Sequence, residues 1–250
     1  MKIASLNLNG FDNALVNGFE QWLAQQDADI ICLQDIREQE YKLPKAVLEP
    51  KGYEAYFFES DPADLGGVAI FTQVLPKAII RGIGSFDVDQ EGSFIQADFG
   101  GFSVASMLFP HGFEQASAER KAVYLERFMH HFKRTQRKRR NYIFAGSLYM
   151  AHQTIDVKAW QQAQDIAGFL PEERAWMDQL FGPLGFSDAM REVEPSEDQF
   201  SWQQGARAAR FDYQICTPDI AETVLDAYFD EEAGLSEHHP LIVTYDLELY

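Results

Sequence analysis

Short apolar runs recur along the whole chain, and many of them are followed by glycine, asparagine or charged residues. Runs of this kind, rich in β-branched and aromatic residues, are typical of strands. They cover residues 3–9, 30–34, 55–58, 68–72, 78–82, 94–98, 102–107, 142–147, 210–217 and 241–247. Apolar positions at helical spacing predict helices over 16–26, 116–133, 157–166 and 172–181.

The strands follow one another at short spacing, joined by turns such as Leu65-Gly66-Gly67 and Phe99-Gly100-Gly101. This spacing is typical of two sheets packed face to face. Helices lying between the strands would cover the outer faces. We therefore expect an α/β fold, a four-layer α/β sandwich of two mixed β-sheets flanked by helices. With no repeat or linker, residues 1–250 are predicted to form a single domain.

Composition narrows the class of protein. Hydrophobic residues make up 46% of the 250, but no run reaches the roughly 18 apolar residues of a membrane span, and no signal-peptide pattern precedes the first strand. A cytoplasmic location is expected. Cys32 and Cys216 lie in apolar runs without a Cys-x-x-Cys spacing, which predicts buried free thiols.

The formal net charge of −18 disfavours tight binding of a polyanion by this chain alone. Against that background, six of the 21 basic residues form one basic segment: Lys133, Arg134, Arg137, Lys138, Arg139 and Arg140. A solvated helix C-terminus accounts for one or two such charges, and a contact with RNA or a protein would account for the rest. Lys158 and Trp160 are a second candidate RNA contact, because an aromatic ring can stack on a base, although a tryptophan at helical spacing is more typical of a core.

Polar residues also follow several of the predicted strands. Asn7 and Asn9 end the first, Asp35 follows the second, and Asp212 and His238 lie near the last two. Each by itself is typical of a turn or a cap. Because a rigid sandwich positions such ends closely, together they indicate a site.

The neighbours of these residues carry a resemblance. The motifs are Ser5-Leu6-Asn7-Leu8-Asn9-Gly10, Leu33-Gln34-Asp35, Phe109-Pro110-His111-Gly112 and His239-Pro240-Leu241. In them the chain resembles, over nearly its whole length, the exonuclease III-like endonuclease/exonuclease/phosphatase superfamily. That resemblance implies the fold predicted above and, in enzymes of this type, magnesium-dependent phosphodiester hydrolysis.

Several positions depart from the superfamily pattern. Gly146-Ser147-Leu148-Tyr149 stands where the enzymes carry Gly-Asp-x-Asn, so the water-positioning acid and the phosphate-holding amide are both replaced. Asp35 replaces a longer glutamate that binds the metal, and Glu237 stands where an aspartate orients the catalytic histidine. The resemblance therefore implies a remnant pocket, with no catalysis, metal or cofactor expected, made of Asn7, Asp35, Ser147, Tyr149, Asp212, Glu237 and His238.

A narrower resemblance, to the catabolite repression control proteins within this superfamily, is carried by Leu33-Gln34-Asp35, by residues 136–145, and above all by Gly146-Ser147-Leu148-Tyr149 with Ala151-His152-Gln153. It implies a translational repressor that acts with the RNA chaperone Hfq on A-rich mRNA and binds nucleic acid weakly alone. Two alternatives stay open. One is a magnesium-dependent phosphodiesterase of the exonuclease III or abasic-site type that uses Asn7, Asp35, Asp212 and His238, and the other is a protein scaffold without RNA contact.

Two loops bear on these alternatives. Only residues 203–209 separate Trp202 from the Arg210-Phe211-Asp212 strand, where the nucleases have a longer loop that grips DNA. The acidic stretch 226–232 could repel phosphate from the rim of the site, but we expect an ordinary solvated surface loop there.

Overall fold

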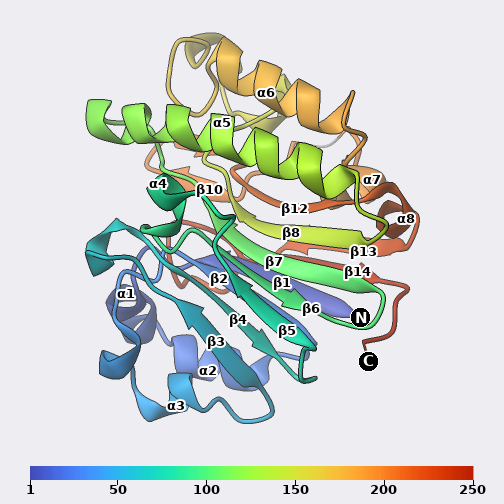
Figure 1. Ribbon diagram of the computed structural model, residues 1–250. Helices are drawn as coiled ribbons and strands as arrows, with labels where there is room; N and C mark the ends of the chain where they lie inside the picture. Colours follow the sequence, from blue (N-terminus) through green and yellow to red (C-terminus); the bar gives the residue numbers. More distant parts are fainter. Residues whose placement is uncertain (197, 250) are drawn as a thin grey trace.

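The computed structural model describes residues 1–196 and 198–249 as two mixed six-stranded sheets with helices on their outer faces, as predicted (Figure 1). In order across the first sheet lie β13 (Val224–Phe229), β14 (Leu241–Tyr245), β1 (Lys2–Asn7), β2 (Ile30–Gln34), β4 (Val68–Thr72) and β3 (Glu54–Phe58). In order across the second lie β5 (Ala78–Arg81), β6 (Phe94–Asp98), β7 (Phe102–Leu108), β8 (Asn141–Ser147), β12 (Asp212–Cys216) and β9 (Ser187–Asp188). The pairs β1·β2 and β7·β8 are parallel, and the other pairs are antiparallel.

Alternation along each strand distributes its side chains between two cores. In β2, Ile30 and Cys32 face the second sheet, whereas Ile31 and Leu33 join the outer cluster beneath the first helices. These helices are α1 (Phe11–Val16), α2 (Phe19–Gln25) and α3 (Lys45–Leu48). Both faces of β2 are buried, which is why this strand reads as a continuous apolar run.

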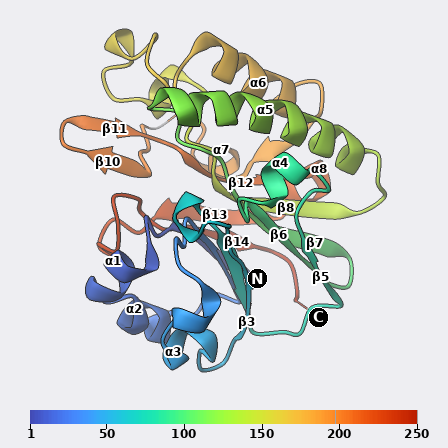
Figure 2. The same ribbon diagram turned by 60° about the vertical axis from the view of Figure 1, so that its left-hand side comes forward.

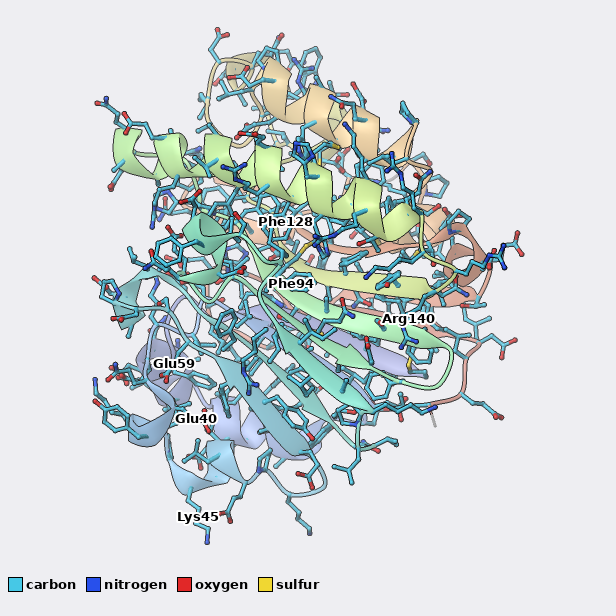
Figure 3. The ribbon with its side chains drawn as sticks, viewed as in Figure 1. Glu40, Lys45, Glu59, Phe94, Phe128 and Arg140 are labelled. Atoms are coloured by element: carbon cyan, nitrogen blue, oxygen red, sulfur yellow. The ribbon has the colours of Figure 1, made fainter. Side chains whose placement is uncertain are left out.

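The outer face of the second sheet is covered by α5 (Gln115–Gln136) and α6 (Pro171–Phe181) (Figure 1). Phe128 on α5 packs against Phe94 on β6, with ring centroids 6.1 Å apart (Figure 3). Shorter helices complete the fold: α4 (Phe86–Asp89), α7 (Ala189–Val193) and α8 (Pro218–Ala221), with 3₁₀ turns η1 (Glu40–Lys42), η2 (Ala63–Leu65), η3 (Thr154–Asp156) and η4 (Trp160–Gln162). The separate hairpin β10 (Trp202–Gln204) and β11 (Arg207–Ala209) projects beside the sheets (Figure 2).

The helix predicted over 157–166 does not form. Val157 instead makes a β-bridge with Ala209, and the Lys158 amide donates to the Ala208 carbonyl. Ala159 then takes a left-handed backbone, with φ at 54°, and only the short η4 turn follows. Pairing with the hairpin therefore overrides the helical spacing of the apolar residues, because those backbone groups bond to β11.

Two further expectations are corrected. The acidic stretch 226–232 is not wholly a loop, because its first residues belong to β13, where Ala227 and Phe229 face inward and pair with β14. The helix predicted over 16–26 begins later, because α1 ends at Val16, Gly18 is left-handed, and α2 covers only Phe19–Gln25. Both cysteines are free and buried, as expected. Within residues 1–196 and 198–249, no helix combines the length and apolar character that crossing a membrane requires.

Candidate functional site

The ends of four strands bring the remnant-pocket residues together. Asn7 ends β1, Asp35 follows β2, and Ser147 ends β8 directly opposite Asp212 in β12. His238 lies just before β14, next to the end of β1. All five side chains are buried, so their polar atoms require partners inside the protein.

Asp212 has such partners at both of its carboxylate oxygens. Ser147 Oγ donates to Oδ1, and the Nδ1 atom of His238 lies 2.7 Å from Oδ2. Ser201 Oγ accepts from the backbone amide of Asp212 at 3.0 Å and fixes the start of the strand. The acid that orients His238 is therefore Asp212. Glu237, expected to stand in that position, instead accepts a hydrogen bond from Asn9.

Tyr149 lies at the centre of the pocket. Its hydroxyl accepts a hydrogen bond of 3.1 Å from Asn7 Nδ2, and its ring meets the His238 ring edge-on at 5.3 Å between centroids. Burial, reinforced by the nearby carboxylates of Asp35 and Asp212, raises the pKa of Tyr149 well above its usual value. The phenol therefore stays neutral and acts as a hydrogen-bonding, space-filling group.

A buried ion pair holds the Tyr149 backbone in place. Lys121 on α5 donates to the Tyr149 carbonyl at 2.8 Å and lies 2.6 Å from Glu173. Glu173 also accepts from the amides of Gly168 and Leu170, so α5, α6 and the loop before α6 meet at this pair. Burial lowers the pKa of Lys121, and the attraction of Glu173 opposes that shift.

Asp35 is engaged by a residue that the sequence analysis did not select. Arg37 donates to Asp35 Oδ1 at 2.8 Å through Nε and to Oδ2 at 2.7 Å through Nη2. Such a two-point contact is the strongest geometry for an arginine and a carboxylate. Burial opposes the charge on Arg37, but the attraction of Asp35 outweighs it and raises the Arg37 pKa.

The described side chains do not fit the magnesium site that the resemblance implies for the enzymes of this superfamily. Mg²⁺ requires oxygen ligands in near-octahedral arrangement. Here the Asp35 carboxylate faces a guanidinium, and Asn7 Oδ1 already accepts from the Asn9 amide at 3.0 Å. No group of three or more histidine, cysteine, aspartate or glutamate side chains suited to a metal is found among residues 1–196 and 198–249.

Comparison with known proteins identifies the fold and the family. Residues 4–234 match the model of the Endonuclease/Exonuclease/phosphatase family. The chain belongs to this family. A curated member, an exodeoxyribonuclease of Bacillus subtilis, is 30% identical over 253 residues, covering 96% of this chain and 98% of that protein. A DNA-(apurinic or apyrimidinic site) endonuclease of Dictyostelium discoideum is 28% identical over 262 residues, covering 99% and 71%.

Solved structures agree with this family assignment. An AP endonuclease from Archaeoglobus fulgidus superposes with a TM-score of 0.88 at 26% identity, covering 99% of this chain and all of that one. A 3'-5' exonuclease from Neisseria meningitidis, at 22% identity and a TM-score of 0.89, shares the fold. The four-layer arrangement is thus that of known members of the family.

The basic segment lies where α5 ends and β8 begins, at Arg140 in Figure 3, whereas the pocket residue Ser147 lies at the other end of β8. Two of its arginines donate hydrogen bonds to other groups of the protein. Arg140 donates to the carbonyls of Phe99 and Phe102 and to Ser103, and Arg134 donates to the Ile83 carbonyl. Arg134 is nevertheless exposed, as are the other four side chains of the segment: Lys133, Arg137, Lys138 and Arg139.

These cations border two surface hollows. Lys138 and Arg139 line one of about 650 Å³ beside α8, and Lys133 and Arg137 line another of about 870 Å³ beside α4. Lys158 is exposed, whereas Trp160 is half-buried and packs on the core between the sheets. Lys158 instead lines an apolar hollow of about 320 Å³ near Trp202, away from the basic segment.

The sequence analysis missed Arg37 and Lys121. The available signal for Arg37 was its place two residues beyond Asp35, since alternate residues of an extended chain share a face. That signal is weak here, because Asp35 and Arg37 both take left-handed backbones that interrupt the alternation. Lys121 gave no signal, because its buried acid partner lies on another helix.

Proposed function

We propose that this chain is a non-catalytic regulator of the catabolite repression control (Crc) type, which represses translation together with Hfq on A-rich mRNA. The observation that carries the proposal is the basic segment, with five exposed cations in a protein of formal net charge −18. Ser147 and Tyr149, in place of the acid and amide of family enzymes, support the absence of turnover.

The charge distribution suits a shared assembly better than independent RNA binding. Overall repulsion weakens binding of a phosphate chain to this protein alone. When a partner already displays the RNA, contact through Lys133, Arg137, Lys138 and Arg139 becomes effectively intramolecular. Weak pairwise contacts then combine into a stable assembly of three components.

Reconstitution of the full chain, Hfq and an A-rich RNA tests the proposal, with each component omitted in turn. A mobility shift or mass measurement is expected to show the assembly only when all three are present. Assembly without RNA would favour the scaffold alternative, and tight RNA binding by this chain alone would contradict the weak affinity proposed here.

A charge-reversal variant tests the segment itself. Changing Lys133, Arg137 and Arg139 to glutamate is expected to abolish assembly while leaving the circular dichroism spectrum unchanged. Arg134 and Arg140 are left intact because they hold backbone carbonyls. The matched control carries glutamate at Lys42, Lys45 and Lys51, around α3 on the opposite outer face (Figure 3). An equal loss in both variants would mean that total charge, not this segment, drives assembly.

The second candidate is a magnesium-dependent phosphodiesterase, which the nuclease relatives favour. It would use Asn7, Asp35, Asp212 and His238. Purified chain is tested with Mg²⁺ or Mn²⁺ on abasic, nicked and single-stranded DNA. We expect no activity above that of an Asp212→Asn variant. Hydrolysis that copurifies with the protein and disappears in that variant would establish the enzyme instead.

A further inference from the structure

Four side chains in the pocket, those of Asn7, Asp35, Asp212 and Glu237, could offer amide or carboxylate oxygen to a cation, and each is already engaged, Glu237 by Asn9. Arg37 bonds both oxygens of Asp35, the Asn9 amide bonds Asn7 Oδ1, and Ser147 and His238 bond Asp212. The positive charge facing Asp35 is thus supplied by the protein. A divalent cation at this carboxylate would have to displace the guanidinium or lie next to it.

Tyr149 fills the space beside these groups. Its ring lies among the rings of His111, Phe113, Phe211 and His238, at centroid distances of 5.3–6.1 Å. What remains between Asp35 and Tyr149 is a hollow of about 80 Å³. Ligand-binding pockets are typically about 300–1,000 Å³. The hollow is therefore too small to receive a nucleotide without movement of Tyr149.

The backbone shows that these side chains are held under constraint. Four non-glycine residues at the pocket have left-handed φ values: Asn9 at 48°, Asp35 at 56°, Arg37 at 47° and Tyr149 at 50°. Such conformations are strained for residues with a Cβ atom and persist only where surrounding contacts enforce them. Here the enforcing contacts are the Arg37–Asp35 pair, the bond from Asn7 to Tyr149 and the grip of Lys121 on the Tyr149 carbonyl.

We infer that Arg37 and Tyr149 act as an internal lock, in which the guanidinium takes the place of a divalent cation at Asp35 and the phenol takes the place of a bound phosphodiester. The lock keeps the pocket closed to metal in the folded protein. It deepens the proposed function by giving the physical reason for the absence of turnover, but it does not depend on the identity of the RNA or of the partner.

Manganese binding tests the lock in the unaltered protein. Free Mn²⁺ is counted by electron paramagnetic resonance at constant ionic strength, so that loose binding to the acidic surface is the same in every sample. The full chain and its Asp35→Asn variant are expected to bind the same number of ions. One additional ion on the unaltered chain, absent from Asp35→Asn, would overturn the inference.

Opening the lock should create a site. The double variant Arg37→Ala with Tyr149→Asn is expected to gain one Mn²⁺ ion bound at least about tenfold more tightly than the surface ions, and addition of Asp35→Asn should remove it. If the folded double variant and its Asp35→Asn derivative bind the same number of Mn²⁺ ions equally tightly, the lock is disproved. Should circular dichroism show an unfolded double variant, Arg37→Ala alone provides the comparison, because that side chain is 39% exposed.

The same preparations separate this inference from the proposed function. Assembly with Hfq and A-rich RNA is measured in EDTA and in Mn²⁺. Failure of assembly with unchanged manganese counts would contradict the regulator and leave the lock standing. A metal site at Asp35 in the unaltered chain, with assembly intact, would overturn the lock alone.

Discussion

At the scale of single residues, Asp156 illustrates how a buried charge is stabilised. Its carboxylate accepts from Arg210 at 2.8 Å, from Arg191 and from the Gln153 amide at 2.8 Å, and Arg210 also pairs with Asp188 at 2.7 Å. Burial by itself would raise the Asp156 pKa, but these partners, Arg210 foremost, lower it to about 2. Each charge in the network depends on the others.

Asp156→Asn is expected to lower the free energy of unfolding by about 3–5 kcal/mol at pH 7, because Arg210 loses a buried partner. Since the folded pKa is about 2 against an ordinary 3.8, this group adds stability above pH 4 that is lost as the pH falls toward 2. The free energy of unfolding, measured with urea between pH 4 and pH 2, should therefore depend less on pH in Asp156→Asn than in the unaltered chain. The exposed Asp165→Asn control should match the unaltered chain, and an unchanged acid profile in Asp156→Asn would refute the prediction.

His131 shows a linkage of the same sign at a higher pH, with a different physical cause. It is buried among Phe94, Phe132 and Phe144, and its Nε2 atom has no hydrogen-bond partner among the described residues. Burial, with Arg134 and Lys138 nearby, lowers its pKa to about 4 from an ordinary 6.5. The unfolded chain therefore takes up a proton first, and stability falls as the pH drops from 6.5 to 4.

Between pH 6.5 and pH 4, the free energy of unfolding of His131→Phe is expected to decline by up to about 3 kcal/mol less than that of the unaltered chain, since one pKa unit corresponds to about 1.4 kcal/mol. Thermal or urea unfolding between pH 7 and pH 4 measures it. His130→Gln, exposed on the same helix, serves as the control. An equally steep decline in His131→Phe would show that another group sets the pH dependence.

At the scale of elements, α5 connects the fold to the proposed surface. Its buried face packs on the second sheet through Tyr124, Phe128 and Phe132, while its last turn begins the basic segment. Lys121 on the same helix holds Tyr149 in the pocket. One helix thus supports the pocket near its beginning and presents cations at its end.

Phe128→Ala is expected to destabilise the protein by about 3–5 kcal/mol, because it removes a ring 4.5 Å from Phe109 and 5.9 Å from Tyr124 between centroids. Chemical denaturation measures the change. The exposed Glu126→Ala on the same helix should alter the free energy of unfolding by no more than about 0.5 kcal/mol. A loss in Phe128→Ala below about 1 kcal/mol would mean that α5 is dispensable to this core.

At the scale of the whole molecule, the net charge of −18 makes the proposed assembly sensitive to salt. Each phosphate neutralised on a single strand contributes about −0.7 to the slope of log affinity against log salt. Changing Lys133, Arg137 and Arg139 to glutamine should therefore reduce the magnitude of that slope by about 2. Glutamine at Lys42, Lys45 and Lys51 is the control, and equal slopes for all proteins would exclude phosphate contact by the basic segment.

The sequence by itself determined the ten predicted strands, the layers and the polar strand ends, but not β9, β10, β11 or β13. Alternating apolar positions report burial directly, because successive side chains of a strand face opposite cores. This is why both buried faces of β2 appear as one apolar run. The motifs around Asn7, Asp35, Asp212 and His238 indicated the family, since each motif is local.

Only the tertiary structure decided what those residues contact. Asn7 donates a hydrogen bond to Tyr149 although 142 positions separate the two residues. Residues 157–158 pair with β11 and therefore do not form the predicted helix. Arg37 was not predicted as a pocket residue, because the left-handed backbones at Asp35 and Arg37 interrupt the alternation of side-chain direction along the strand. Periodicity reports whether a position is buried, whereas the partner that neutralises a buried charge depends on how distant segments pack.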